Sequence, residues 1–222
     1  STGNTENIQL SASRVNVVEG DITDASAISD ASVGVDFISH HAAQLEIFRS
    51  SEDPVQDLEV NTIGTLNVLE AALRNGVGKV VSASSACIYG QTDGATDETS
   101  MPVPNWTYGV SKLAAERYCT IYNEYRGLPT VSLRYGIVYG EREWYRRVLT
   151  IFIKRAVERE SLVVFGDGSQ ARDFVHVSDV VKMNRACMTN DRANGQAFNV
   201  GTGVATTVAE LADLVVAECV PE

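Results

Sequence analysis

Tyr108 and Lys112 lie four positions apart in the segment YGVSK, at the start of a helical pattern. On a helix this spacing puts both side chains on one face, one turn apart. A free tyrosine has a pKa of about 10, and roughly 4 kcal/mol of preference for the phenolate would bring it to about 7. One ammonium at ~6 Å, with an effective dielectric constant of ~20, supplies roughly 2.8 kcal/mol. The pair therefore predicts a tyrosine that acts as a base, with Lys112 lowering its pKa.

Two serines, Ser84 and Ser85, end the apolar segment KVVSASS, where they can hydrogen-bond a substrate alcohol and relay its proton to Tyr108. The predicted reaction removes an alcohol proton while a hydride leaves the same carbon for a cofactor. An oxidised nicotinamide ring would supply the second positive charge that the tyrosine needs. Each feature alone is common, because a Tyr–Lys pair arises by chance and serines often follow strands as turn residues. Their convergence on one sheet edge favours catalysis over coincidence.

Short apolar segments alternate with long amphipathic ones along the chain. We expect strands at 14–21, 35–43, 78–85, 129–136 and 162–165, and helices at 54–74, 108–127, 145–159, 178–189 and 207–219. This alternation is typical of a parallel sheet with helices on both faces. Ligands of such sheets bind at the carboxyl ends of the strands, where polar clusters fall in this sequence. The clusters are Glu19–Asp21, His40–Ala43, Ser82–Ser85 and Arg134-Tyr135.

The composition bounds the class of protein. The chain has 222 residues, 44% of them apolar, and a formal net charge of −11, which fits one globular domain or one domain with part of another. The acidic balance argues against nucleic acid as a partner. No run approaches the ~18 apolar residues of a membrane span, and no secretory leader is recognised, so we expect a cytoplasmic protein without a membrane partner. The three histidines and four cysteines lack ligand spacing, so no metal site is predicted.

Several segments occur in an order and at a spacing typical of one enzyme family: VEGDITD, VDFISHHAAQ, NTIGTLNVLEAA, SSACIYG, YGVSK, FGDGSQARDFVHVSDV and FNVGTG. On these segments the chain resembles the extended short-chain dehydrogenase/reductase family, specifically its NAD-dependent nucleotide-sugar epimerase/dehydratase group. The resemblance implies an α/β fold, a Rossmann-like doubly wound parallel sheet with the first βαβ unit missing and with part of a smaller C-terminal substrate domain. It also implies a partial NAD-binding domain at 1–160 and a partial substrate-binding portion, interleaved with it, at 161–222.

The resemblance implies roles for individual residues as well. Tyr108 is the expected acid/base, Lys112 its partner on the nicotinamide ribose, and Ser85 the hydroxyl that binds the reacting sugar oxygen. The positions expected to bind NAD are Asp21, Ile22, His41, Ala42, Asn61, Tyr108, Lys112 and Tyr135. Arg172, in QARDF, is expected to bind the nucleotide or its phosphates, a role that suits a basic side chain.

The two residues after Ser85 narrow the reaction. Family members that dehydrate the sugar generally carry an Asp-Glu pair there, whereas this chain has Ala86-Cys87, which can neither take the C5 proton nor protonate the leaving hydroxyl. The implied activity is a 4-epimerase that oxidises the sugar transiently at C4 and returns the hydride, with a UDP-sugar as the expected substrate. The alternatives are a nucleotide-sugar reductase or dehydrogenase of the same family, and a non-catalytic fragment unable to bind the dinucleotide. Gly136-Ile137 stands where many epimerases have Phe-Asn, so the sugar and the nucleotide stay open.

The glycine-rich loop of the family has no counterpart in the sequence. Family members begin with a strand, a Gly-x-x-Gly-x-x-Gly loop and a helix that hold the pyrophosphate, whereas Gly3 and Gly20 are isolated here. We therefore expect a chain that starts after the second strand of the family and ends before the substrate pocket is complete. The strand end that distinguishes NAD from NADP is also missing. Helices near 57–74 and 108–126 often form the dimer interface in this family, so a homodimer is expected of the full-length protein.

Overall fold

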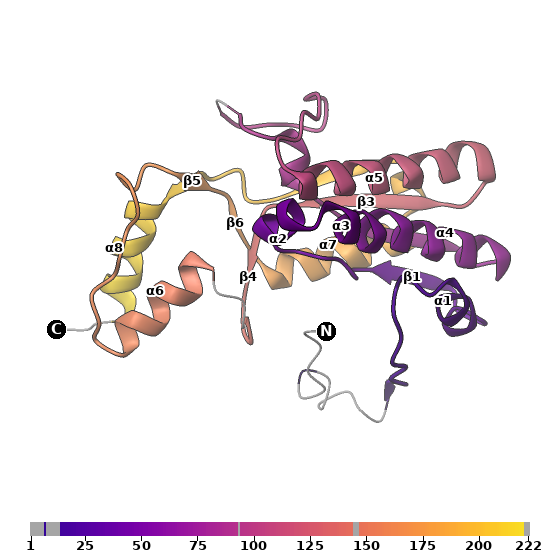
Figure 1. Ribbon diagram of the computed structural model, residues 1–222, viewed down its shortest axis with the longest axis horizontal. Helices are drawn as coiled ribbons and strands as arrows, with labels where there is room; N and C mark the ends of the chain where they lie inside the picture. Colours follow the sequence, from indigo (N-terminus) through magenta and orange to yellow (C-terminus); the bar gives the residue numbers. More distant parts are fainter. Residues whose placement is uncertain (1–6, 8–13, 93, 144–146, 220–222) are drawn as a thin grey trace.

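The fold is built around a parallel sheet of four strands (Figure 1). The computed structural model describes residues 7, 14–92, 94–143 and 147–219. The strands are β1 (Phe37–His40), β2 (Lys79–Ser85), β3 (Thr130–Tyr135) and β7 (Ala197–Val200), paired in the order β1-β2-β3-β7. The register places Ser84 beside Arg134 and Ser85 beside Tyr135. The carboxyl ends of the four strands therefore lie along one edge of the sheet.

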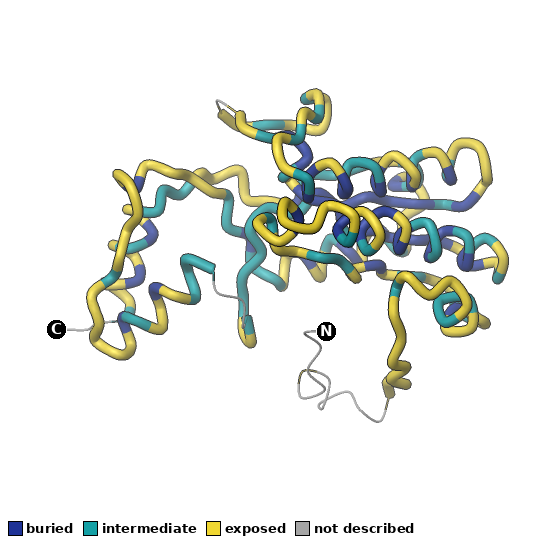
Figure 2. Tube along the Cα trace, in the orientation of Figure 1, coloured by how far each residue is buried: buried dark blue, intermediate teal, exposed yellow. Residues whose placement is uncertain are grey.

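Helices cover both faces of this sheet. On one face lie α4 (Gly64–Arg74) and α5 (Thr107–Arg126), and on the other lies α7 (Val177–Thr189). Neighbouring strand residues point to opposite faces. Val80 accordingly packs with Leu69 in the core under α4 and α5, whereas Val81 packs with Val180 in the core under α7. Figure 2 shows the buried segments concentrated in these layers. The predicted Rossmann-like parallel sheet with helices on both faces is confirmed.

Three short helices lead into α4: α1 (Ala25–Ala31), α2 (Ile47–Glu52) and α3 (Pro54–Leu58). Pro54 occupies the first turn of α3, and the Asp53 carboxylate caps that helix by accepting the Gln56 N–H at 3.0 Å. A π-helical turn, Glu59–Ile63, then joins α3 to α4. The helix expected at 54–74 is therefore continuous, but it carries a π-helical turn of the kind that often marks a functional site.

A smaller part of the molecule follows β3 and lies beside the main sheet (Figure 1). It contains the parallel pair β4 (Ile137–Tyr139) and β6 (Phe174–His176) and the antiparallel pair β5 (Ala171–Arg172) and β8 (Thr206–Thr207). Helices α6 (Val148–Val157) and α8 (Val208–Cys219) pack on each other through Phe152 and Leu211. The chain enters this part, returns to the main sheet with α7 and β7, and enters it again. The division at residue 160 remains a prediction. No helix among the described residues has the length and apolar character that a bilayer span requires.

Two of the expected strands are wrong. Residues 15–20 have no regular secondary structure, and Val17 and Val18 are 55% and 63% exposed. The segment 162–165 is also irregular, and Phe165 is 83% exposed. Both segments have the apolar composition of strands, but neither has a hydrogen-bonded partner strand in the described part of the chain, and a strand is stable only when its backbone groups are paired. The expected helix at 145–159 begins at Val148 in the described residues, and residues 145–146 lie outside them.

Candidate active site

Ser85, Tyr108 and Lys112 come together where β2 ends and α5 begins. Ser85 is the last residue of β2, and its side chain hydrogen-bonds that of Tyr108. Tyr108 and Lys112 lie in the first two turns of α5, and they are 8% and 4% exposed. The three predicted catalytic residues therefore form one buried cluster at the carboxyl edge of the sheet, where ligands of such folds bind.

The start of α5 is held by α2 rather than by its own sequence. Trp106, at the N-cap position, makes no capping hydrogen bond with its side chain. The Ser50 hydroxyl of α2 instead accepts the Tyr108 backbone N–H at 3.2 Å and contacts the Thr107 hydroxyl at 2.7 Å. Ser50 thus satisfies one of the backbone donors that every helix start leaves unpaired. This contact fixes the position from which Tyr108 projects.

Burial controls the protonation of the pair. It raises the pKa of Tyr108 to about 12, with a further upward contribution from Cys87, while the Ser85 hydrogen bond and the charge of Arg147 act downward. Burial also lowers the pKa of Lys112 to about 8. The sequence argument expected Lys112 to bring the phenol toward neutrality. For the protein by itself this is wrong, because the loss of hydration disfavours a buried phenolate and a buried ammonium alike.

Asn61 sits in the π-helical turn and joins three segments. Its amide nitrogen lies 3.1 Å from the Ser111 hydroxyl and 3.0 Å from Asp57 Oδ1, and its amide oxygen accepts the Gln44 N–H at 2.8 Å. Asn61 was expected at the cofactor wall, but its polar atoms are engaged within the protein. It therefore holds α5 beside Lys112, and its expected contact with the cofactor remains a prediction.

His40 and Thr65 form a pair of hydrogen bonds that ends at the Asn61 backbone carbonyl. The Thr65 hydroxyl donates to the Asn61 carbonyl at 2.6 Å and lies 3.0 Å from His40 Nε2, so the histidine nitrogen is the donor in that contact. Burial, the charge of Lys112 and His41 together lower the pKa of His40 to about 3. His40 is thus a neutral structural residue that hydrogen-bonds Thr65 within the protein.

His41 and Tyr135 form a second contact across the strand ends. The Tyr135 hydroxyl lies 3.0 Å from His41 Nε2 and accepts the Asn184 amide N–H at 2.6 Å. The two rings stack with centroids 5.8 Å apart. The structure thus brings together two of the residues predicted to bind the cofactor. Asn184, on α7, was not singled out from the sequence, because nothing in its local pattern indicates that it reaches Tyr135.

The remaining predicted residues lie farther out. Asp21 is exposed and accepts the backbone and hydroxyl hydrogens of Thr23, which hold its pKa below the ordinary value. Ile22 packs against Gly64 of α4, where an added Cβ would lie 2.9 Å from its side chain. Ala42 is exposed in the segment after β1. These three residues have no described contact with Ser85, Tyr108 or Lys112.

Arg172 belongs to the smaller part of the molecule. It is exposed on β5, and its guanidinium donates to the Ala171 carbonyl at 2.7 Å. The neighbouring Asp173 carboxylate accepts the N–H groups of Thr202 and Gly203 at 2.8 Å each, which fixes the loop after β7. The structure does not bring Arg172 to the catalytic cluster. Its expected role in binding the nucleotide remains a prediction.

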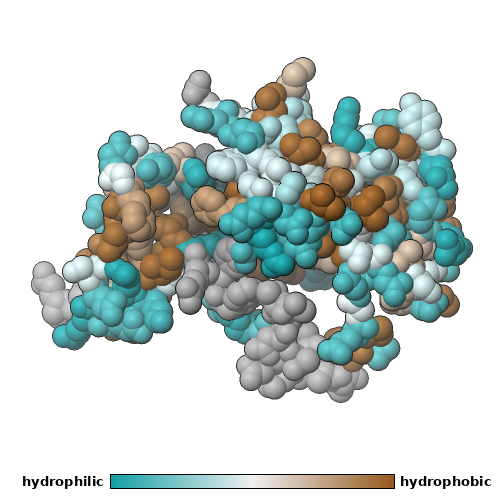
Figure 3. Space-filling view, viewed as in Figure 1, coloured by the Kyte–Doolittle hydropathy of each residue, from teal (hydrophilic) through white to brown (hydrophobic). Residues whose placement is uncertain are grey.

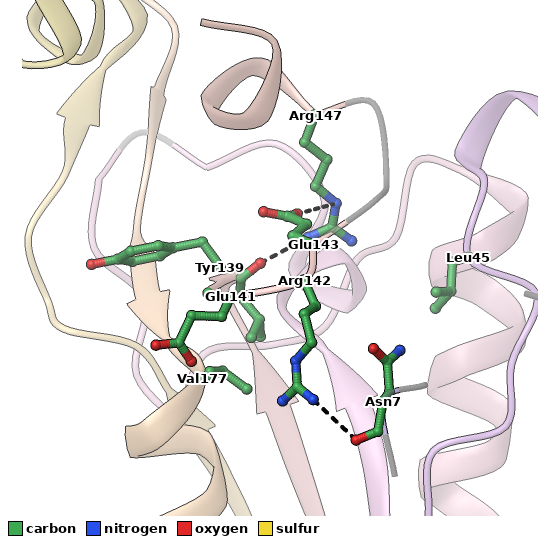
Figure 4. Close-up of a pocket in the computed structure, with 10 residues that line it drawn as sticks. Asn7, Leu45, Tyr139, Glu141, Arg142, Glu143, Arg147 and Val177 are labelled. Carbon is green, nitrogen blue, oxygen red and sulfur yellow. Dashed lines mark hydrogen bonds and ion pairs between the residues drawn. The ribbon is translucent and has the colours of Figure 1, made fainter. Parts of the chain in front are cut away.

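A cavity of about 330 Å³ lies next to the end of β4 and the segment after β1 (Figure 4). Its walls include Leu45, after β1, and Tyr139, at the end of β4. Arg147 enters it from the start of α6, where its guanidinium donates to the Val138 carbonyl at 3.3 Å and lies 3.9 Å from Glu143. The charge of Arg147 also contributes to lowering the pKa of Tyr108 in the predicted catalytic cluster. The sequence offered no motif for Arg147.

The family of the chain follows from comparison with known proteins. A family model described as "NAD dependent epimerase/dehydratase family" matches residues 1–201. The chain belongs to this family. The predicted membership is thereby confirmed, and NAD is the cofactor that the family's description names.

The relatives differ in the reaction they are named for. A putative UDP-glucose 4-epimerase of Methanocaldococcus jannaschii is 36% identical, over 96% of this chain and 70% of its own length. A dTDP-glucose 4,6-dehydratase of Streptomyces niveus is 30% identical, over 91% of this chain and 60% of its own length. The solved UDP-glucose 4-epimerase of Thermus thermophilus, in complex with NAD, superposes with a TM-score of 0.88 at 35% identity, over 97% of this chain and 71% of that one. The comparisons therefore support a nucleotide-sugar epimerase/dehydratase and do not separate the two reactions.

Proposed function

We propose that this protein is an NAD-dependent nucleotide-sugar 4-epimerase acting on a UDP-sugar. The observation that carries the proposal is the buried cluster of Ser85, Tyr108 and Lys112 at the carboxyl edge of the sheet. A hydroxyl donor, a phenol and an ammonium at this edge suit the removal and return of an alcohol proton. The relative from Methanocaldococcus jannaschii, which carries the 4-epimerase name, supports the same reaction.

The cluster fits a dinucleotide cofactor. Lys112 is 4% exposed, yet no acceptor in the described part of the chain hydrogen-bonds its ammonium. An ammonium on a largely buried side chain is stabilised by hydrogen-bond acceptors, and the hydroxyls of a nicotinamide ribose would supply them. His41 and Tyr135, stacked across the neighbouring strand ends, would line the same side of the site. Bound NAD supplies the acceptor and donor of the hydride.

In this mechanism the protein's own residues move one proton. Tyr108 takes the proton of the sugar 4-hydroxyl at its phenolic oxygen, while Ser85 hydrogen-bonds the same sugar oxygen and then the ketone that replaces it. After the keto-sugar turns over in the site, Tyr108 returns the proton as the hydride returns to the opposite face of C4. Because burial raises the pKa of Tyr108 to about 12 in the protein by itself, the phenolate would depend on the positive charge that the oxidised nicotinamide adds, and Lys112 would hold the nicotinamide ribose.

The residues after Ser85 favour epimerisation over dehydration. Ala86 and Cys87 form the first half of the turn η3 (Ala86–Tyr89), and the Cys87 backbone N–H donates to the Ser85 hydroxyl at 3.2 Å. Neither side chain is a carboxylic acid, so neither suits proton transfer at C5 or at a leaving hydroxyl. The site accordingly supports a reaction confined to C4.

The test is to supply the complete gene product with NAD and with UDP-glucose or UDP-galactose, and to follow the anomeric protons by NMR together with NADH absorbance. Interconversion of the two sugars without net NADH supports the proposal. Net NADH formation would identify a dehydrogenase, and loss of the 6-hydroxyl a dehydratase. Tyr108→Phe, which keeps the ring, is expected to abolish turnover but not NAD binding. Calorimetry with NAD alone tests the alternative of a non-catalytic protein, which predicts no binding.

We also infer that the protein works as a homodimer, packed through α5. The side chains of Val110, Ala114, Tyr118, Ile121 and Tyr125 recur every three or four residues and form one stripe on this helix. Val110 and Tyr125 are 53% and 78% exposed. Figure 3 shows apolar surface where α3, α4 and α5 lie side by side. An apolar stripe of this kind suits a two-fold helix-to-helix contact, in which the same surface meets itself.

The cysteines fit the expected cytoplasmic location. All four, Cys87, Cys119, Cys187 and Cys219, are free thiols in the structure. Free, largely packed thiols are typical of proteins in a reducing compartment. This observation supports the proposal that the reaction takes place in the cytoplasm.

A further inference from the structure

A buried ion pair lies behind the catalytic cluster and has no part in the mechanism above. The Arg134 guanidinium, on β3, donates two hydrogen bonds to the Glu116 carboxylate, on α5. The Nη2–Oε1 distance is 2.7 Å and the Nε–Oε2 distance is 3.1 Å. The side chains are 8% and 4% exposed. Removing two charges from water is costly, so a buried pair is weak evidence for stability, and its use is more often to fix one arrangement of the groups around it.

Glu116, the acidic partner of the ion pair, is hydrogen-bonded to β2, the strand that ends at Ser85. The Ser84 hydroxyl donates to Glu116 Oε2 at 2.7 Å, and the register of β2 and β3 sets Ser84 directly beside Arg134. Glu116 is also one helical turn beyond Lys112 and two turns beyond Tyr108, on the same face of α5. The carboxylate of Glu116 therefore ties this face of α5 to β2 at the residue that precedes Ser85.

Arg134, the basic partner of the ion pair, is connected by hydrogen bonds to the loop at 96–98. Arg134 Nη1 donates to the Tyr89 hydroxyl at 2.6 Å, and that hydroxyl donates to Asn199 Oδ1 at 2.8 Å. The guanidinium carbon also lies 5.2 Å from the centre of the Tyr89 ring. Asn199, on β7, then donates from its backbone to the Glu98 carboxylate at 2.7 Å and from its side chain to the Thr96 carbonyl at 3.1 Å. A directed chain of hydrogen bonds thus runs from Arg134 to the loop at 96–98.

We propose that Arg134 and Glu116 are positioning residues for the proposed reaction. They hold the Ser85 hydroxyl and the Tyr108–Lys112 face of α5 at a fixed separation, and they anchor the loop at 96–98 beside the end of β7. Arg134 also offsets the negative charge that Glu116 would otherwise place one turn from Lys112. The inference rests on the proposed function, because it assigns the pair a task in that reaction.

The test removes both charges at once, because deleting one partner would leave the other charge buried and unpaired. In the double variant Glu116→Leu/Arg134→Met we expect cooperative folding and NAD affinity within a few-fold of the wild type. We expect kcat to fall by about tenfold to a hundredfold, with KM nearly unchanged, because misplacing reacting groups by about 1 Å costs up to that factor. Ser84→Ala, which keeps the ion pair but removes one hydrogen bond to the buried carboxylate, is expected to give a smaller fall in kcat and a lower unfolding temperature.

Lys79→Met is the matched control. Lys79, at the opposite end of β2, is a buried charge whose partner Asp191 is exposed, with side chains 3% and 93% accessible. Its loss is expected to lower stability and to leave kcat unchanged. A folded double variant with wild-type kcat would overturn the positioning role, and so would an unfolded double variant together with a Ser84→Ala variant of wild-type kcat.

A second readout separates this inference from the proposed function. Crystal structures of the wild type and of the folded variant, Glu116→Leu/Arg134→Met or otherwise Ser84→Ala, would compare the positions of the Ser85 hydroxyl and Lys112 ammonium. If the wild type turns over no nucleotide sugar, the proposed function fails, and these structures still decide whether the pair positions the cluster. Superimposable positions would overturn the inference whatever the activity.

Discussion

Gly109 lies directly against the backbone carbonyl of Cys87. A Cβ placed on Gly109 would be 2.6 Å from that oxygen and 2.9 Å from the Pro104 side chain. This contact brings the first turn of α5, with Tyr108, onto the turn that follows Ser85. The approach is possible only because residue 109 has no side chain, and its neighbour is backbone that cannot rotate away.

We expect Gly109→Ala to move the first turn of α5, with Tyr108, away from the turn that follows Ser85. The added methyl group has no space, so the variant should lose about 1–3 kcal/mol of unfolding free energy, as in other overpacked sites, and its activity per folded molecule should fall as well. Gly127→Ala is the control, since Gly127 ends the same helix with a φ of 69°. It should cost stability without lowering the specific activity. Denaturant unfolding and turnover would be measured on both, and an active Gly109→Ala variant would contradict the close contact.

Lys112→Met is expected to stabilise the protein while inactivating it. The folded state holds the pKa of Lys112 at about 8 against an ordinary value of 10.5, so burying the charged form costs about 3 kcal/mol at pH 7. Between pH 8 and about 10.5 the unfolded chain keeps a proton that the folded protein has released, so the unfolding free energy of the wild type rises with pH. The Met variant should therefore be more stable at pH 7, and this advantage should disappear by about pH 10.5.

Lys154→Met is the control for that measurement, because the Lys154 side chain is 73% exposed and its loss should change stability by less than about 0.5 kcal/mol. Chemical denaturation at a series of pH values would give the difference between wild type and variant. A Lys112→Met variant that is less stable than the wild type at pH 7 would show that the ammonium contributes more through its contacts than its burial costs.

The sequence predicted that Ser85, Tyr108 and Lys112 lie together, and the structure brings them together, while their catalytic role stays a prediction. The four-residue interval from Tyr108 to Lys112 fixes their shared face on any helix, and the apolar run before Ser85 defines a buried strand that must end there. The protonation of the same groups could not be predicted, because the pKa of Tyr108 depends on how completely α2 and η3 cover it. A one-dimensional pattern does not contain that coverage.

Contacts between distant segments were the main omission. Glu116 and Arg134 each look like an ordinary charged residue on a helix and a strand, and only the register of β2 with β3 places Ser84 beside Arg134, where both side chains reach Glu116. Asn184 and Tyr135 meet for the same kind of reason. The opposite error occurred at Val17 and Val18, where a strand-like composition has no partner strand among the described residues.

Arg147 is expected to tune the pH dependence of the reaction. Its charge lowers the pKa of Tyr108, so Arg147→Met should raise that pKa and move the acid limb of the kcat/KM profile to higher pH. The Arg147 side chain is 33% exposed, so solvent screening should keep the shift below about one pH unit. Arg155→Met, at the other end of α6, where Arg155 donates to the Ser161 carbonyl at 3.0 Å, is the control and should leave the profile unchanged. If the acid limb of the kcat/KM profile of Arg147→Met lies at the wild-type pH or at a lower pH, Arg147 does not lower the pKa of Tyr108.

The stripe on α5 predicts which substitutions separate the proposed dimer. Val110 and Ile121 lie three turns apart on one face and are 53% and 44% exposed, so Val110→Glu/Ile121→Glu places four like charges in a two-fold contact. Sedimentation should show a dimer for the wild type and a monomer for this variant, with unchanged far-UV circular dichroism. Val181→Glu/Leu214→Glu introduces the same charges at apolar positions of α7 and α8 that are 51% and 57% exposed, and it should remain dimeric. A dimeric α5 variant would place the interface elsewhere, and a monomeric wild type would remove the dimer from the proposal.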